Sequence, residues 1–229
     1  MRHLAIVLII ILSIPYGHAQ IHELGVFVGG SNLIGDVGAT DYISPNQLAL
    51  GGLYKWNRSP RHSWRASLMY TKLKADDSKS DDPRRIQRDY VFASRILEAS
   101  AGMEFNFFDF DLHSGKNVIT PYLYTGLSIA YHKNYYFNAG VQTAENTSSL
   151  IYGIPLVLGV KTTFIDKLIL GFEVGARTTF SDEIEGSVPD SESKQALYRF
   201  GNINNNDWYV FTGITLTYTF GIKPCYCAN

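Results

Sequence analysis

Cysteine is scarce in this sequence, with two residues in 229, and both stand within the last five positions, Cys225 and Cys227. Two thiols this close in an extended tail bridge each other poorly, and two ligands do not complete a zinc site. The six histidines are spread along the chain and add no metal-binding pattern. The sequence therefore predicts no disulfide scaffold, no metal site and no cofactor.

Long apolar runs and a large net charge are also lacking. Residues 1–19 have the pattern of a secretory signal peptide, with a basic start, an apolar run and small residues at a cleavage site that would leave Gln20 first. No apolar run long enough for a spanning helix follows, although a strand of a membrane barrel needs only about ten residues with one apolar face. The formal net charge of −1 gives no electrostatic case for nucleic acid as a partner.

Aromatic residues and glycine are abundant, with 15 Tyr, 13 Phe, 3 Trp and 20 Gly against 18% charged residues. This composition fits strands and turns better than helices. Alternation of apolar and small or polar residues recurs about eight times, whereas no long window has helical spacing. The predicted strands cover about residues 22–31, 47–56, 63–74, 93–106, 120–132, 151–164, 168–180 and 208–220. The sequence predicts an all-β fold.

The connections between these strands alternate between long and short. The long ones, near Asp36, Asp81, Asn138 and Glu192, would lie at one end of the fold. Long loops at one end and short turns at the other are typical of outer-membrane barrels. We therefore expect an eight-stranded antiparallel transmembrane β-barrel over residues 20–220, with long extracellular loops, short periplasmic turns and both termini in the periplasm. Residues 221–229 would form a short periplasmic tail that carries the two cysteines.

A secreted carrier of an apolar ligand, similar to a lipocalin, is the alternative barrel. A solvent-exposed strand face would carry many long polar side chains, whereas the polar faces here consist of Gly, Ser, Thr, Ala and Tyr with scattered charges. Small residues mixed with a few large ones suit the crowded lumen of eight strands. The strand near 93–106 is the clearest case, since Leu97 and Met103 share one face while Glu98 and Glu104 share the other.

Charged residues on the polar faces predict a network of ion pairs in the lumen. Four anions and three cations fall on these faces, namely Glu23, Glu98, Glu104, Glu173, Arg65, Lys161 and Arg177. Buried charges need partners, so a structural role is the preferred interpretation. A proton or ion pathway is the alternative.

Large aromatic residues stand near the ends of the predicted strands. They include Trp56, Trp64, Tyr70, Tyr131 and Trp208. Such positions fit the girdles that flank the apolar band of a membrane barrel, although ordinary barrel packing would also place aromatics there. The last strand, "TGITLTYTF", ends on Phe220 and resembles the C-terminal signal by which barrel substrates are recognised during outer-membrane assembly. These features favour a membrane barrel over a carrier.

The sequence gives no support for an enzyme. His62-Ser63 and His113-Ser114 are the candidate nucleophile and base pairs, but adjacent residues of a strand point to opposite faces and both pairs fall in predicted turns. We therefore name no catalytic residue. Basic residues at 84, 85 and 88 stand among aspartates in the second long connection, where a solvated loop of mixed charge is favoured over a contact with anionic lipopolysaccharide.

Three segments carry a resemblance to a known family: "ELGVFVGGSNLIGDVG", "YISPNQLALGGLYKWN" and "ILEASAGMEFNFF". The chain resembles the PorG family, small outer-membrane β-barrels of the Bacteroidetes type IX secretion system. The most specific part of the resemblance is a glycine-rich motif made of Gly29, Gly30, Ser31, Asn32, Gly35 and Asp36. Gly30 aligns with the lipid face of its strand, where it would mark a bulge or a close approach near the outer rim.

The resemblance implies a non-enzymatic accessory role in protein secretion, together with gliding motility in species that glide. Members are associated with a periplasmic ring built from a PorK-like lipoprotein and a PorN-like companion, and they tie this ring to the outer membrane. Outer-membrane lipids would be the remaining partners, with no small-molecule substrate. A structural barrel unrelated to secretion stays open as an alternative.

A periplasmic tail would place Cys225 and Cys227 in an oxidising compartment. Exposed cysteines in an oxidising compartment suggest pairing with another chain. We therefore expect Cys225 or Cys227 to form a mixed disulfide with a ring component, and an inert tail is the alternative.

Overall fold

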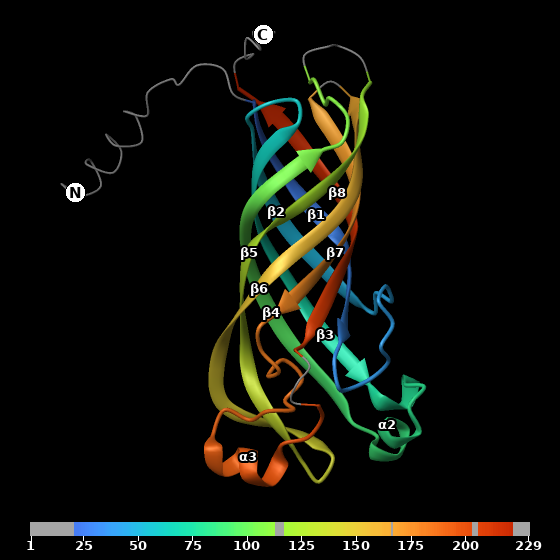
Figure 1. The fold of residues 1–229 in the computed structure, drawn as a ribbon, viewed down its shortest axis with the longest axis vertical. Coiled ribbons are helices and arrows are strands. Elements are labelled where there is room, and N and C mark those ends of the chain that lie inside the picture. Colours follow the sequence, from blue (N-terminus) through green and yellow to red (C-terminus); the bar gives the residue numbers. More distant parts are fainter. Residues whose placement is uncertain (1–20, 113–116, 166, 203–205, 222–229) are drawn as a thin grey trace, which may run out of the picture.

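The chain forms a closed barrel of eight antiparallel strands in which each strand pairs with its neighbours in sequence and β8 returns to β1 (Figure 1). The computed structural model describes residues 21–112, 117–165, 167–202 and 206–221. The strands are β1 (Ile21–Ile34), β2 (Gln47–Asn57), β3 (His62–Asp76), β4 (Val91–Asn106), β5 (Ile119–Asn138), β6 (Val141–Ile165), β7 (Leu168–Thr179) and β8 (Trp208–Phe220). The predicted fold class is confirmed.

Three short helices lie in the connections: η1 (Asp77–Lys79), α2 (Pro83–Arg88) and α3 (Glu192–Tyr198). Asp82 caps the N-terminus of α2, since its side chain accepts a hydrogen bond from the backbone N–H of Arg84, and Pro83 takes the first helical position. In the described part of the chain, no helix has both the length and the apolar character that a membrane crossing requires.

Close contact between β1 and β8 closes the barrel. Gly29 lies directly opposite Gly213, and a Cβ atom at Gly29 would lie 2.6 Å from the Cα atom of Gly213. The ring of Phe27 covers both glycines from the lumen, because it would lie 2.8 Å and 2.6 Å from their added Cβ atoms. Glycine is required at this pair, since any side chain would collide with the facing strand and with Phe27.

Connections 35–46, 77–90, 139–140 and 180–207 meet at one end of the barrel, where Figure 1 shows helices α2 and α3 and the tip of the β5–β6 hairpin. The first residue of β1 and the last residue of β8 lie at the opposite end. We call the end with α2 and α3 the outer mouth.

The long loop predicted near Asn138 is wrong. Strands β5 and β6 continue past the predicted ends and meet in a two-residue turn at Ala139 and Gly140, which have φ values of 48° and 83°. Two residues with positive φ make the tight turn that suits a twisted hairpin. The register of β5 and β6 shifts between Lys133 and Tyr135, and this bulge reverses the alternation that identifies a strand.

Candidate functional site

The outer face of the barrel is apolar over a continuous belt. Side chains on this face that are exposed include Leu24, Val26, Val28, Leu50, Leu68, Leu97, Met103, Leu127, Ile129, Ile154, Leu156, Leu158, Val160, Phe172, Ile214 and Leu216. Leu127 is 71% exposed, which is far from the environment of an apolar side chain in a soluble domain. An apolar patch of this extent around the whole circumference indicates a surface in contact with lipid.

Aromatic residues bound the belt at both ends. Trp64, Tyr54, Tyr218 and Phe220 are exposed near the end that carries the chain termini, and Tyr70, Tyr131, Tyr152 and Trp208 are exposed toward the outer mouth. Trp56 points outward too, with the guanidinium of Arg58 at 5.2 Å from its ring centroid. Of the five aromatic residues proposed for the girdles, all lie on the outer face near an edge of the belt.

Charge returns to the outer face directly beyond the belt. Exposed cations lie just beyond the belt on three strands. Lys72 lies two residues beyond Tyr70, Arg95 two residues from Leu97, and Lys133 two residues beyond Tyr131. This change from apolar to cationic marks the level at which a membrane interior gives way to headgroups and water. The surface is therefore that of a membrane-spanning barrel of the outer-membrane type.

The lumen carries the charges that the sequence placed there. The seven predicted residues are all buried on the inner face: Glu23, Arg65, Glu98, Glu104, Lys161, Glu173 and Arg177. Six of them form ion pairs, and Glu23 instead accepts hydrogen bonds from Asn57 at 2.7 Å and Thr217 at 2.9 Å.

Glu104 is the centre of this lumenal network. Its carboxylate lies 2.8 Å from the ammonium of Lys55, 2.6 Å from that of Lys161 and 3.5 Å from the guanidinium of Arg65. Arg65 also donates two parallel hydrogen bonds to Glu173, at 2.7 Å and 2.8 Å. A bidentate pair of this kind is the strongest geometry open to these two groups.

Tyrosine hydroxyls complete the partners of the lumenal carboxylates. Tyr122 donates to Glu173 at 2.6 Å, and Tyr209 donates to Glu98 at 2.6 Å. Arg177 approaches Glu98 with its Nε atom at 3.3 Å. Each lumenal carboxylate thus has at least two partners, which is the condition under which a buried charge is tolerated.

Lys55 is the member of the network that the sequence analysis missed. It is 2% exposed, and it brings the lumenal set to four carboxylates and four cations. The signal was present, because Lys55 shares the face of β2 that also carries Ala49 and Gly51. The set is therefore electrically neutral, and it fills the lumen together with rings such as that of Tyr124, which lies 4.7 Å from the guanidinium of Arg65.

A second group of carboxylates lies at the outer mouth. Asp36 follows β1, Asp182 and Glu185 belong to the connection 180–207, and Asp207 precedes β8. Ligand atoms of Asp36, Asp182 and Glu185 lie within 4.8 Å of one another. We call these four residues the mouth carboxylates.

Backbone amides hold the mouth carboxylates in place. Glu185 accepts hydrogen bonds from the N–H of Asp36 at 2.7 Å and of Val37 at 3.0 Å. Asp207 accepts one from the N–H of Ile184 at 3.0 Å. Because these contacts join the end of β1 to the connection 180–207, the carboxylates tie together segments that are about 150 positions apart, as the separation of 149 between Asp36 and Glu185 shows.

Asp182, Glu185 and Asp207 resist ionisation. Burial raises the pKa of Asp182 to about 7, and the negative charge of Asp36 adds to the rise. Burial also raises the pKa of Glu185 and that of Asp207, and the negative charges of the other members act in the same direction. These shifts follow from burial first, and then from the proximity of other acids with few cations nearby.

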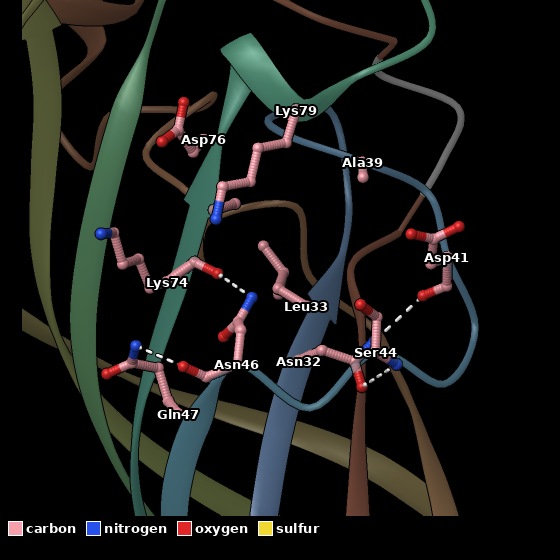
Figure 2. Close-up of a pocket in the computed structure, with 11 residues that line it drawn as sticks. Asn32, Leu33, Ala39, Asp41, Ser44, Asn46, Gln47, Lys74, Asp76 and Lys79 are labelled. Carbon is pink, nitrogen blue, oxygen red and sulfur yellow. Dashed lines mark hydrogen bonds between the residues drawn. The ribbon is translucent and has the colours of Figure 1, made fainter.

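The glycine-rich motif leads from the barrel wall into this mouth. Asn32 points outward and fixes the segment 39–46, because its Nδ2 atom donates to the carbonyl of Asp41 at 3.0 Å and its Oδ1 atom accepts from the N–H of Ser44 at 3.3 Å (Figure 2). A Cβ atom at Gly30 would lie 2.5 Å from Cβ of Pro45, which is the close approach expected at that position.

The remaining motif residues act on the inner side. Gly29 makes the contact with β8 described above, and the hydroxyl of Ser31 lies 2.6 Å from that of Thr71. Gly35 has no side chain at the point where the carboxylates of Glu185 and Asp207 converge. Segment 39–46 also leaves a pocket of about 210 Å³ against β3, where Asn46 donates to the carbonyl of Lys74 at 3.1 Å (Figure 2).

Two of the three arginines in the connection 77–90 are structural. Arg85 donates to the carbonyls of Gly35 at 3.0 Å and Gly38 at 2.8 Å, and Arg88 forms an ion pair with Asp77 at 2.8 Å. Arg84 is exposed and pairs with Asp82, the residue that caps its own helix. The connection is therefore a folded part of the mouth, and only Arg84 fits the solvated loop of mixed charge that the sequence favoured.

The candidate catalytic pair His62-Ser63 is divided by the barrel wall. Ser63 is buried in the lumen and donates to Asn57 at 2.7 Å, whereas His62 is exposed on the other side. His113 and Ser114 lie outside the described residues, and so do Cys225, Cys227 and the predicted signal peptide.

Comparison with known sequences places the chain in a family. Residues 2–229 match the family described as "Domain of unknown function (DUF6089)". The chain belongs to this family. Among curated proteins, no sequence matches.

Solved outer-membrane barrels have a similar arrangement of strands. The attachment invasion locus protein Ail of Yersinia pestis aligns with a TM-score of 0.48 and 9% identity over 88% of this chain and 99% of its own. Neisserial surface protein A aligns with a TM-score of 0.43 and 11% identity over 88% and 95%. OprG of Pseudomonas aeruginosa aligns with a TM-score of 0.43 and 9% identity over 89% and 97%.

Proposed function

We propose that this protein is an outer-membrane β-barrel that acts as a non-enzymatic accessory component of type IX protein secretion. In this proposal it links a periplasmic ring, built from a PorK-like lipoprotein and a PorN-like companion, to the outer membrane. Both termini and the short turns face the periplasm, and the outer mouth faces the exterior.

The observation that carries the membrane part of the proposal is the inversion of the two barrel faces. Apolar side chains such as Leu127 point outward, and charged side chains such as Glu104 and Arg65 point inward. A soluble carrier needs the opposite arrangement, with an apolar cavity inside and polar residues outside. A bacterial barrel with this arrangement belongs in the outer membrane.

The filled lumen supports a role as an anchor. Lys55, Glu104 and Lys161 meet across the interior at distances below 3 Å, so cargo has no path through the barrel. A barrel without a conduit contributes to secretion by what its surfaces hold. In this proposal the surface toward the ring is the end that carries the termini, including the connection 58–61 and the tail.

The secretion part of the proposal rests on the resemblance carried by residues 23–38 and two further segments. Affinity purification from mild detergent tests it, with a tag placed on the extracellular α3 and identification of the lipoproteins that copurify. We expect the ring lipoprotein and its companion. Their absence under conditions that retain an intact, heat-modifiable barrel would contradict the secretion role and leave a structural barrel unrelated to secretion.

The tail provides a second test of the same link. Non-reducing gels of membranes should contain a thiol-sensitive band of high mass in the wild type that is lost in Cys225→Ser/Cys227→Ser. Each single substitution identifies which thiol pairs. If the wild type has no such band, the intermolecular disulfide is ruled out, whereas copurification can still succeed through other contacts.

A further inference from the structure

When they are ionised, the mouth carboxylates carry more negative charge than the cations around them balance. Among the described residues, two cations face the four acids: Arg85, whose Nη2 atom lies 3.8 Å from Asp36, and Arg199, whose charge favours the ionised form of Asp182. Glu183, the next residue along the chain, adds a further negative charge near Asp182. With the four acids ionised against two guanidinium groups, the cluster lacks two positive charges.

Asp207 provides a separate indication of a binding site. It is 1% exposed, and although its Oδ2 atom accepts a hydrogen bond from Ile184, its Oδ1 atom has no partner among the residues that the structure describes. The Oδ2 atom of Asp182 is likewise buried without a partner there. A buried carboxylate oxygen without a partner is costly, and natural structures satisfy such atoms with water or an ion.

The unpartnered oxygen of Asp207 and a carboxylate oxygen of Glu185 converge on a space that the chain leaves open at Gly35. A Cβ atom at Gly35 would lie 2.2 Å from Oε2 of Glu185 and 2.8 Å from Oδ1 of Asp207, so both atoms occupy the side of Gly35 where a side chain would stand. A pocket of about 220 Å³ opens beside them and is lined by Gly35, Asp36, Asp182 and Asp207. The volume is sufficient for an ion that keeps several waters.

We infer that the mouth carboxylates form a binding site for a divalent cation of the calcium class. Asp36, Asp182 and Glu185 supply the ligand atoms, and the free oxygen of Asp207 completes the site directly or through water. Oxygen ligands from carboxylates suit a hard cation, and calcium tolerates the irregular geometry that three loop segments provide. The absence of His or Cys from the cluster disfavours zinc and copper.

The position of this site gives the ion a structural task. Asp36 follows β1, Asp182 and Glu185 follow β7, and Asp207 leads into β8, so one ion joins the three strand ends on this side of the mouth. Binding therefore orders the connections 35–46 and 180–207 against each other. Since the outer mouth lies at the end opposite the termini, the site is independent of the proposed link to the periplasmic ring.

Calcium binding to the purified, folded full-length barrel in detergent tests the inference. Protein stripped with chelator is titrated with CaCl₂ at pH 7.5 by calorimetry, and its melting temperature is compared in CaCl₂, MgCl₂ and chelator. We expect saturable binding of one Ca²⁺ and a higher melting temperature in calcium, because an ion that binds only the folded state stabilises it by mass action. The absence of both effects would overturn the inference.

Three variants separate a built site from a general effect of charge. Asp182→Asn removes a ligand, and Gly35→Ala keeps every charge but places a methyl group among the carboxylate oxygens, so both should weaken binding by at least about tenfold. Glu183→Gln removes one negative charge from the same connection and should change the affinity less than about twofold. Heat-modifiability on gels verifies that each variant is folded.

Equal affinity in wild type, Asp182→Asn and Gly35→Ala would place the ion elsewhere and overturn the assignment. Secretion phenotypes and copurification of ring lipoproteins are not used as readouts. Failure of the calcium site and failure of the secretion role are therefore distinguishable.

Discussion

The lumen buries four carboxylates, whereas the outer mouth gathers four of which Glu185 and Asp207 are buried and the other two are half-buried. In the lumen Glu104 meets three cations, and Glu173 accepts a bidentate pair and a tyrosine hydroxyl. At the mouth Asp207 and Asp182 each keep one buried oxygen without a partner among the described residues. The comparison teaches that burial of a charged group alone says little about its role, whereas the balance of its partners separates a structural network from a site that awaits a ligand.

Removal of the central lumenal anion should give the largest effect. Glu104→Gln leaves Lys55, Arg65 and Lys161 buried without their shared partner, and we expect a loss of about 3–5 kcal/mol in the free energy of unfolding. Denaturant unfolding of the barrel in detergent measures it, with the exposed Glu192→Gln as control. A loss below about 1 kcal/mol would contradict the role of Glu104 as the shared partner of these three cations.

A smaller loss should follow when one lumenal hydrogen bond is removed and the ion pairs are kept. Tyr122→Phe deletes the hydroxyl that donates to Glu173 at 2.6 Å but leaves the bidentate pair with Arg65. Hydrogen bonds to charged groups contribute about 1.5–3 kcal/mol, so the loss should fall in that range. The same denaturant series measures it, and a loss equal to that of Glu104→Gln would argue against Glu104 as the centre.

At the outer mouth, removal of a carboxylate should stabilise the protein when calcium is absent. Asp182→Asn removes a negative charge from an unbalanced cluster, so in chelator we expect the melting temperature to rise by about 2–4 °C, the change that 1 kcal/mol produces in a chain of this length. In calcium the same variant should melt below the wild type because it loses a ligand. A fall in chelator would show that the charge of Asp182 is already balanced.

Stability in chelator should also depend on pH. The pKa of Asp182 is about 7 in the folded state, raised by burial and by Asp36, with Glu183 adding and Arg199 opposing, against about 3.9 in the unfolded chain. Between these values the folded state binds more protons than the unfolded state, so the free energy of unfolding falls as pH rises from about 4 to about 7.

Melting temperatures in chelator at pH 5 and pH 7.5 check this sign. The raised pKa values of Glu185 and Asp207 act in the same direction and extend the decline toward higher pH. Asp182→Asn should decline less than the wild type over this interval. A wild-type melting temperature that rises with pH would contradict the unbalanced mouth.

The regular alternation of the strands explains which parts of the structure the sequence could predict. Within a strand, alternation fixes the face of each residue, so Arg65, Glu98 and Glu173 could be placed in the lumen before any coordinates. The same argument would also have placed Lys55 in the lumen, because its neighbours on that face of β2 are small. The extension of the β5–β6 hairpin could not be predicted in this way, because the bulge between Lys133 and Tyr135 breaks the alternation.

The cluster of mouth carboxylates could not be predicted from alternation. Asp36 and Asp207 stand in segments without periodicity, and their proximity depends on closure of β1 against β8 and on the path of the connection 180–207. The motif around Gly35 and Asp36 is distinctive in the sequence, but nothing in the sequence indicates which carboxylates lie beside it. Only the fold brings Glu185 to the backbone amide of Asp36.

The interlocked lumen also has a mechanical consequence. Side chains from β2, β3, β4, β6 and β7 are bonded to one another across the interior through Lys55, Arg65, Glu104, Lys161 and Glu173. Such cross-bracing resists both flattening of the cylinder and shear between its strands. A pull applied at the end that carries the chain termini therefore moves the barrel as one rigid body in the bilayer, and the surrounding lipid bears the load.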